Sequence, residues 1–251
     1  MTLTLGLIFF IYGLVFGSFF NVVGLRVPND SLFTQKRSYC DVCNRTLTWQ
    51  ELIPVFSFVK QKGKCSTCQS SISLLYPVME LGTALLFLLT YLVYGISWHT
   101  LFGLLLISLV MSVTVSDWVY QKIPNKLLIF YTPLVILYRL FFPLAPYWTS
   151  VVGAVFAFAL VFLIILFSKG GMGVGDLKYY TFFGFVFGFS QFLLLFLLST
   201  IYGTLYGLSM MLLNKATRKS RIPFGPFIGF AALTVYFFGN SIIQWYLNFL
   251  L

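Results

Sequence analysis

Long apolar runs constrain this chain more than any other feature of its sequence. Eight apolar segments follow one another along it, and most of them reach the roughly 20 residues that a helix needs to cross a bilayer. The expected fold is therefore an all-α polytopic membrane protein with about eight transmembrane helices. The predicted spans are residues 3–25, 74–94, 98–116, 123–143, 148–168, 177–190, 192–213 and 227–250.

The composition agrees with a membrane fold and excludes the common soluble classes. Only 9% of the 251 residues are charged, against about a quarter in ordinary soluble domains, and 59% are apolar. So few charges cannot cover a water-soluble enzyme of this length, and so apolar a chain is not disordered. The formal charge of +10 fits basic loops on the cytoplasmic side of a membrane, so we expect membrane lipid and no nucleic acid as partners.

The stretch 177–213 decides the topology. As one helix it would be about 55 Å long, far more than a hydrocarbon core of ~30 Å, whereas a break near Gly188, Ser190 and Gln191 makes two short spans. With eight spans and the N-terminus outside, the inner loops hold fifteen of the sixteen Lys and Arg residues, and only Arg139 falls elsewhere. These inner loops are residues 26–73, 117–126, 169–178 and 214–221.

Three pairs of glycines four residues apart predict close contacts between helices. Small residues at this spacing let two backbones approach one another in a membrane, so the pairs report on packing and not on chemistry. They are Gly13 and Gly17, Gly184 and Gly188, and Gly203 and Gly207.

Residues 26–73 form the one sizeable segment expected in water, and all four cysteines lie there as two C-x-x-C pairs. This spacing is typical of a tetrahedral zinc site, and four thiolates leave no open position, so we expect structural Zn²⁺. Two disulfides become the better interpretation if the topology is inverted. The chain then divides into a first transmembrane helix (1–25), a zinc-binding insert (26–73) and a helical bundle (74–251). The predicted ligands are Cys40, Cys43, Cys65 and Cys68.

Three of the six carboxylates fall within or at the ends of predicted spans. Glu80 lies inside the second span, Asp117 closes the third, and Asp176 opens the sixth. Ionisable groups at membrane depth are costly and mark functional sites. Asp117 and Asp176 are separated by two crossings, so they lie on the same face of the membrane. Their alternative role is structural, as interfacial caps or as partners of Lys122 and Lys178.

Two carboxylates that meet at a membrane boundary suggest aspartic-type hydrolysis, in which an ionised Asp activates water and a protonated Asp hydrogen-bonds the carbonyl. The helix dipole favours the anion at a helix N-terminus, so we assign Asp176 as base and Asp117 as acid. The glycine run before Asp176 would let the backbone bend and a substrate approach, through Gly173 and Gly175.

Seven motifs follow one another along the chain. They are Gly17-Ser-Phe-Phe-Asn-Val-Val, the two cysteine pairs, Trp49-Gln-Glu-Leu-Ile-Pro54, Tyr76-Pro-Val-Met-Glu80, Asp117 with Ile123-Pro124, Gly173-x-Gly-Asp176 and Ile222-Pro-Phe-Gly-Pro-Phe. In this order they resemble the motifs of the type IV prepilin leader peptidases, a family of membrane aspartic peptidases. The resemblance covers nearly the whole chain, and Val119, Tyr120 and Asn125 depart from polar residues that are common in the family.

The resemblance implies a substrate and a second activity. The substrate would be a prepilin, or a pilin-like protein of competence or secretion systems, with a basic leader that is cut at the cytoplasmic face of the bacterial plasma membrane. Many members also methylate the new N-terminus with S-adenosylmethionine, which makes Glu51 a candidate for cofactor binding. Glu80, Gly173 and Gly175 are candidates for substrate approach. The alternative for Glu80, which we favour, is a structural role in which it bonds backbone groups or hydroxyls within the bundle.

Two other functions remain as alternatives at this point. A proton-coupled carrier would relay protons through Asp117 and Asp176, but such carriers more often place their acids near the midplane and contain internal repeats. A zinc-knuckle scaffold would recruit a partner through the insert and use the bundle as an anchor, so its function would survive loss of either aspartate.

Overall fold

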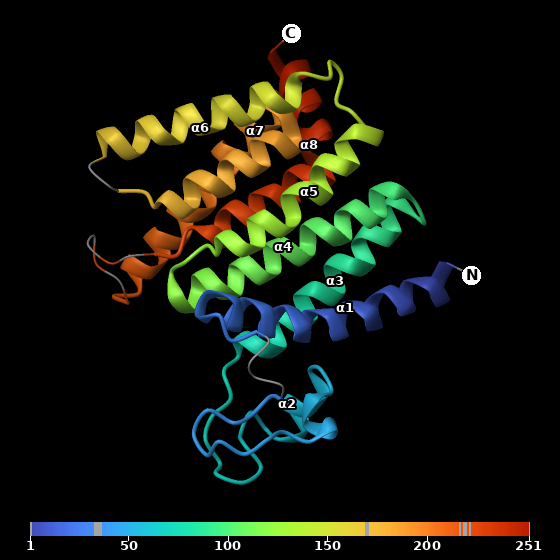
Figure 1. Cartoon of the computed structure of the whole chain (residues 1–251), viewed down its shortest axis with the longest axis vertical. Coiled ribbons are helices and arrows are strands. Elements are labelled where there is room, and N and C mark those ends of the chain that lie inside the picture. The colour runs from blue at the N-terminus through green and yellow to red at the C-terminus, as the bar shows by residue number, and fades with distance from the viewer. Residues whose placement is uncertain are drawn as a thin grey trace. The chain divides into compact units, whose positions relative to one another are not determined.

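The computed structural model describes residues 2–32, 37–168, 171–215, 217, 220 and 222–250, and the regular elements within them are helical (Figure 1). The long helices are α1 (Thr2–Arg26), α3 (Leu75–Tyr94), α4 (Trp98–Tyr120), α5 (Asn125–Phe141), α6 (Thr149–Phe167), α7 (Val174–Leu212) and α8 (Gly225–Leu250). The insert between α1 and α3 holds the short ones, which are η1 (Val27–Asn29), η2 (Trp49–Leu52) and α2 (Phe56–Lys60).

Among the described residues, six helices are long and apolar enough to cross a membrane by length and composition, namely α1, α3, α4, α6, α7 and α8. They confirm the predicted all-α polytopic fold. Helix α5 is shorter, with 17 residues, and it contains Pro133 and Arg139. It occupies the range predicted for the fourth span.

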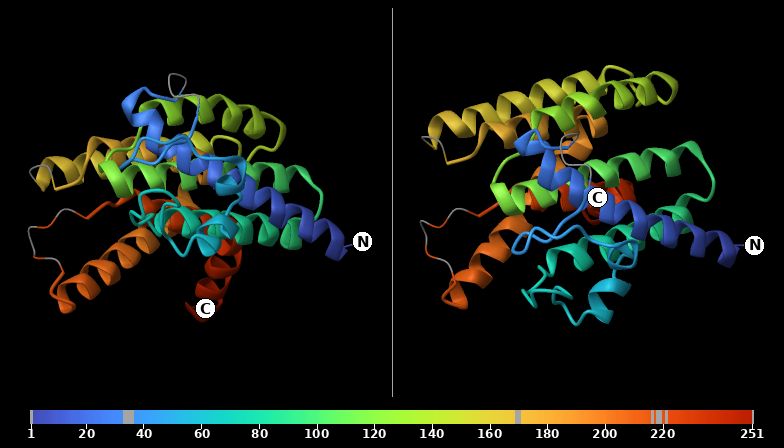
Figure 2. Two further views of the ribbon diagram at one scale, coloured as in Figure 1. Left: turned by 90° about the horizontal axis from the view of Figure 1, so that it is seen from below. Right: turned by 60° about the horizontal axis from the view of Figure 1, so that its bottom comes forward.

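Helix α7 is interrupted where the sequence predicted a break. Gly188 has φ 75° and ψ 179°, a conformation that no helix residue adopts and that glycine reaches without strain. The Tyr180 hydroxyl lies 2.6 Å from the Ser199 hydroxyl, and its ring contacts Phe192 edge-on. A straight helix would separate residues 180 and 199 by about 28 Å. The chain therefore reverses at Gly188, and Figure 2 shows the two halves of α7 as separate ribbons.

Helices α1 and α3 cross at the first predicted glycine pair. A Cβ atom at Gly13 would lie 2.5 Å from the Cα of Ala84, and one at Gly17 would lie 2.8 Å from the Cα of Glu80. The side-chain amide of Asn21 donates to the carbonyls of Gly17 (3.2 Å) and Tyr76 (3.3 Å). The small residues thus bring the Glu80 turn of α3 against α1, as the spacing predicted.

The second glycine pair brings α7 against α6. A Cβ atom at Gly184 would lie 2.4 Å from the carbonyl oxygen of Gly153, and Gly188 lies against the same residue. The guanidinium of Arg139 on α5 donates to the carbonyl of Val186, which would pair with residue 190 in an unbroken helix. The break in α7 is therefore held from two sides.

The chain forms two compact units, Met1–Val119 and Tyr120–Leu251. The first contains α1, the insert, α3 and all but the last residue of α4, and the second contains α5 to α8. The predicted division into a first helix, an insert and a bundle remains a prediction.

Candidate metal centre and catalytic carboxylates

Each C-x-x-C pair lies in a small loop that is closed by the same backbone pattern. In the first loop the N–H of Cys40 bonds the carbonyl of Arg45 (2.9 Å), and the N–H of Asn44 bonds the carbonyl of Cys40 (2.8 Å). The second loop repeats the pattern around Cys65, whose carbonyl accepts from Gln69 (3.0 Å). Asn44 and Gln69 both have left-handed φ angles, of 54° and 57°. Two matched knuckles therefore present their cysteines.

The four sulfur atoms lie within 4.8 Å of one another, and all four cysteines are free thiols. The Sγ atoms of Cys40 and Cys68 are 3.7 Å apart. A tetrahedral zinc site with Zn–S bonds of about 2.3 Å separates its sulfurs by about 3.8 Å, whereas a disulfide bond is about 2.05 Å long. The cluster thus has the donors and the spacing of a metal site that could hold an ion.

Backbone groups of the knuckles favour the thiolate forms that a metal needs. The pKa of Cys40 is lowered to about 6, chiefly by hydrogen bonds from the N–H groups of Cys43 and Val42. The pKa of Cys65 is also lowered, by the corresponding N–H groups of Cys68 and Thr67. Hydrogen bonds to the charged form favour that form at these two cysteines. At Cys43 the N–H of Arg45 acts in the same direction, but burial and the neighbouring sulfurs outweigh it and raise the pKa to about 11.

Glu51 joins the two knuckles. Its carboxylate accepts a bidentate pair of bonds from Arg45, at 2.6 Å and 3.1 Å, and a further bond from the hydroxyl of Ser66 (2.7 Å). The Glu51 carboxylate also accepts a hydrogen bond from the backbone N–H of Thr48 (2.9 Å), as part of a capping box at the start of η2. Arg45 holds the pKa of Glu51 well below its usual range, with Thr48 and Ser66 adding to the effect. The sequence reasoning missed this network, whose members lie up to 21 residues apart.

Glu80 fastens the insert to α3. Its Oε2 atom accepts a hydrogen bond from the backbone N–H of Val55 at 2.7 Å, and the hydroxyl of Ser18 on α1 bonds the same carboxylate. The side chain is buried. Glu80 was predicted as a substrate-approach residue or, as the favoured alternative, as a structural residue, and in this structure its carboxylate binds a backbone N–H and a hydroxyl of the protein.

Asp117 lies three residues before the end of α4 and is buried, with 6% of its surface exposed. The chain then leaves the helix through Gln121, whose φ of 52° is left-handed, and passes Ile123 and Pro124 to the start of α5. The aspartate is therefore held on a regular element just before a sharp change of direction.

Asp176 occupies the first turn of α7 and is half-buried. The backbone N–H of Gly173 donates to its Oδ2 atom at 3.2 Å, and a Cβ atom at Gly173 would stand 3.2 Å from that same oxygen. A Cβ atom at Gly175 would lie 3.2 Å from the Cβ of Ile123. The amine of Lys178 binds the amide oxygen of Asn125 at 2.9 Å. Gly173 thus lets the backbone N–H approach the Asp176 carboxylate, and Gly175 lets the start of α7 pack against the segment before α5.

The predicted site residues separate into three groups. The cysteines come together in the insert, with Glu51 joining their loops. Glu80 is engaged with the insert from α3. Asp117 belongs to the first unit and Asp176 to the second, so the meeting of their carboxylates remains a prediction.

Comparison with known proteins matches both parts of the chain. The bacterial peptidase A24 N-terminal domain matches residues 11–94, and the type IV leader peptidase family matches residues 104–208. No solved structure matches the chain with significance.

Three relatives match nearly the whole chain. The chain is 38% identical over 241 residues to the prepilin leader peptidase/N-methyltransferase of Bacillus subtilis, covering 96% of this chain and 97% of the relative. It is 30% identical over 275 residues to the protein of that name from Aeromonas salmonicida, covering 96% and 94%. With the Neisseria gonorrhoeae protein of that name it shares 28% identity over 270 residues, covering 95% and 93%.

Proposed function

The chain belongs to the type IV leader peptidase family, and from this premise we propose that Asp117 and Asp176 are the two carboxylates with which it cleaves prepilin leaders. The family assignment supports aspartic peptidase activity over the carrier and the scaffold. The observation that carries the residue assignment is the setting of Asp176, on a glycine-framed helix start with a backbone N–H directed at its carboxylate.

The roles follow from where each group lies on its helix. The positive end of the α7 dipole and the N–H of Gly173 stabilise Asp176 as an anion, so it takes the proton of the attacking water. Asp117 stands near the negative end of the α4 dipole and acts in its protonated form, as a donor to the scissile carbonyl oxygen. The water oxygen forms the new C–O bond, the C–N bond breaks, and a proton from the pair passes to the leaving amine.

The covalent chain limits how far apart the two aspartates can lie. From Asp117 the helix continues to Tyr120, and three more residues reach Ile123, a path of at most about 15 Å. Ile123 is the residue that stands against Gly175, the neighbour of Asp176. This covalent limit is compatible with the joint site that we propose.

The names of the relatives indicate a prepilin as the substrate, and we extend the proposal to pilin-like precursors with a basic leader, as the sequence resemblance implies. We place cleavage at the cytoplasmic face of the bacterial plasma membrane, because the predicted inner loops carry almost all basic residues. The substrate backbone approaches Asp176 past Gly173, which is exposed, whereas the space beside Gly175 is taken by Ile123. Glu80 assists by holding the insert in place through its hydrogen bond with Val55.

The four thiolates of the cluster would hold a structural Zn²⁺, which fixes the two knuckles against one another and has no open position for chemistry. The relatives are also named N-methyltransferases, and we assign S-adenosylmethionine as the methyl donor and the insert as its site. Both oxygens of Glu51 are taken by Arg45, Thr48 and Ser66, so Glu51 contributes by ordering the turn around η2.

The decisive experiment incubates the purified protein with a pilin precursor and sequences the N-terminus of the product. Asp117→Asn and Asp176→Asn should each lower cleavage by about 10²–10⁴-fold or more, because each removes one half of the acid–base pair. The matched controls Lys122→Gln and Lys178→Gln should keep activity. Equal losses in these controls, or normal cleavage by either Asn variant, would show that the aspartates serve only as ion-pair partners or caps.

A further inference from the structure

The insert exposes an apolar face on its short helix α2. Phe56 and Val59 are three residues apart on the helix, so they share a side, and they are 59% and 66% exposed. The neighbouring turn η2 packs against α2 and carries Trp49, which is 73% exposed. Large apolar side chains exposed on two contacting elements outside the spans mark a candidate interaction surface.

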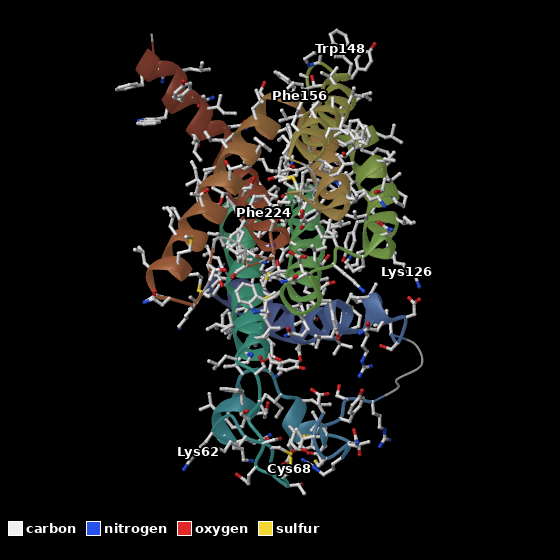
Figure 3. The ribbon with its side chains drawn as sticks, turned by 90° about the vertical axis from the view of Figure 1, so that its left-hand side faces the viewer. Lys62, Cys68, Lys126, Trp148, Phe156 and Phe224 are labelled. Carbon is white, nitrogen blue, oxygen red and sulfur yellow. The ribbon has the colours of Figure 1, made fainter. Side chains whose placement is uncertain are left out.

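Basic residues border this apolar face. Lys60 is four residues after Phe56 and therefore lies on the same side of α2, and Lys62 lies two residues beyond the end of the helix. Figure 3 shows Lys62 pointing outward from the insert, well apart from Cys68 and its cluster. Residues 52–73 contain no acidic side chain. The face is thus apolar with a positive border.

The position of α2 is fixed close to the bilayer. Val55, the residue before Phe56, is hydrogen-bonded to Glu80, which lies in the second turn of the membrane-spanning helix α3. One end of α2 is therefore held at the boundary of a span. A short amphipathic element at this depth, with aromatic rings and lysines, matches the composition of interfacial membrane anchors.

We propose that the docking face, which consists of Trp49, Phe56, Val59, Lys60 and Lys62, inserts into the anionic headgroup layer of the bilayer that holds the protein. Charge selects this occupant, because lysines attract anionic lipid headgroups and repel the basic leader of a precursor. The apolar side chains enter the boundary of the acyl region while the lysines remain among the phosphates. The insert is then supported on two sides, by Glu80 and by the membrane.

The test uses the full chain in lipid nanodiscs made of phosphatidylcholine, with or without phosphatidylglycerol. The emission of Trp49 is obtained by subtracting the spectrum of Trp49→Phe from that of the unaltered protein. It is measured with phosphatidylcholine brominated on its acyl chains and with aqueous acrylamide. Both leaflets of a nanodisc have the same lipids, so the result does not depend on the orientation or the peptidase activity proposed above.

With phosphatidylglycerol present, we expect Trp49 to be quenched by brominated lipid and shielded from acrylamide. Each lysine near an anionic surface contributes about 1 kcal/mol, so Lys60→Gln with Lys62→Gln should lower the ratio of docked to undocked insert about 30-fold. The control Lys122→Gln with Lys126→Gln removes the same charge outside the insert and should change nothing. Retained metal content shows that each variant insert is folded.

Two results would overturn the proposal. In one, Trp49 is open to acrylamide and indifferent to brominated lipid in both kinds of nanodisc. In the other, lipid leaves Trp49 exposed and only an added pilin precursor shields it, which would assign the face to the substrate.

Discussion

The backbone N–H of Val55 donates a hydrogen bond to the carboxylate of Glu80, with 2.7 Å between nitrogen and Oε2. Val55 has φ 60° and ψ −49°, and the N–H of Phe56 bonds the carbonyl of Pro54 at 2.6 Å, so Val55 is the centre of a γ-turn. This conformation is strained for a β-branched residue and persists only when its surroundings hold it. The hydrogen bond with Glu80 is one of the interactions that hold it.

Glu80→Ala should loosen the insert from α3. The change leaves the N–H of Val55 without its acceptor, at a cost of about 1–3 kcal/mol. Hydrogen exchange and limited proteolysis over residues 53–60 should rise. Glu80→Gln keeps an acceptor oxygen and should have a smaller effect. Identical exchange in both variants and the unaltered protein would show that the bond does not hold the insert.

Val55→Gly should stabilise the same turn. A left-handed Val costs on the order of 1–3 kcal/mol, while glycine adds about 0.5–1 kcal/mol of unfolded-state entropy, so a net gain near 1 kcal/mol is expected. The measurement is the resistance of the insert to proteolysis in detergent. Val59→Gly, in the helical turn that follows, is the matched control and should weaken the insert. Lower resistance of the Val55→Gly insert to proteolysis would contradict the claim that Val55 is strained.

The ion pair of Glu51 with Arg45 should make the insert sensitive to acid. Arg45 lowers the pKa of Glu51, so the unfolded carboxyl binds a proton at higher pH than the folded one. Its contribution to stability is complete above the ordinary carboxyl pKa of about 4.3 and is lost as the pH falls below that value.

Glu51→Gln removes this dependence and serves as the reference. The difference in thermal stability of the insert between the unaltered protein and Glu51→Gln should be largest near neutral pH and shrink below about pH 4.3. The difference is measured at each pH because acid also protonates the cysteine thiolates in both proteins. A stability difference that grows as the pH falls would refute a stabilising ion pair between Glu51 and Arg45.

Some of these features follow from sequence patterns and others do not. The reversal in α7 was predicted because one helix was too long for a bilayer, and the contact between Tyr180 and Ser199 confirms it. The contact of Gly13 with Ala84 was likewise expected from glycine spacing. The length of an apolar segment and the spacing of glycines can both be read from the sequence without knowledge of the tertiary fold.

Partners of buried polar groups could not be predicted in this way. Glu80 binds a backbone N–H 25 residues away in an irregular loop, which no spacing rule identifies. Arg139 was the one basic residue that fell outside the predicted inner loops. It is accommodated because its guanidinium binds the carbonyls of Val186 and Phe142, which the break in α7 and the end of α5 leave open.

The cysteine cluster should carry about one metal ion per chain, since four thiolates complete a tetrahedral site. Removal of the ion by a chelator should unfold the insert and expose its backbone to protease, because folding and binding of such sites are coupled. Cys68→Ser should lower metal content, whereas Ser73→Ala, outside the cluster, should not. Metal-free protein with two disulfides would disprove the site.

Gly175→Val should impair cleavage by displacing the start of α7. A Cβ atom at position 175 would stand 3.2 Å from the Cβ of Ile123, tighter than ordinary contact, and the branched Val adds two methyl groups there. The shift moves Asp176 relative to the segment that leads back to Asp117. We expect a loss of about 10²-fold in turnover, since errors near 1 Å in catalytic geometry have this effect.

Gly82→Ala is the control that should retain activity, because a Cβ atom at position 82 meets only the flexible end of Met111 at 3.4 Å. Unchanged cleavage by Gly175→Val would mean that the glycine run is only a connection between helices.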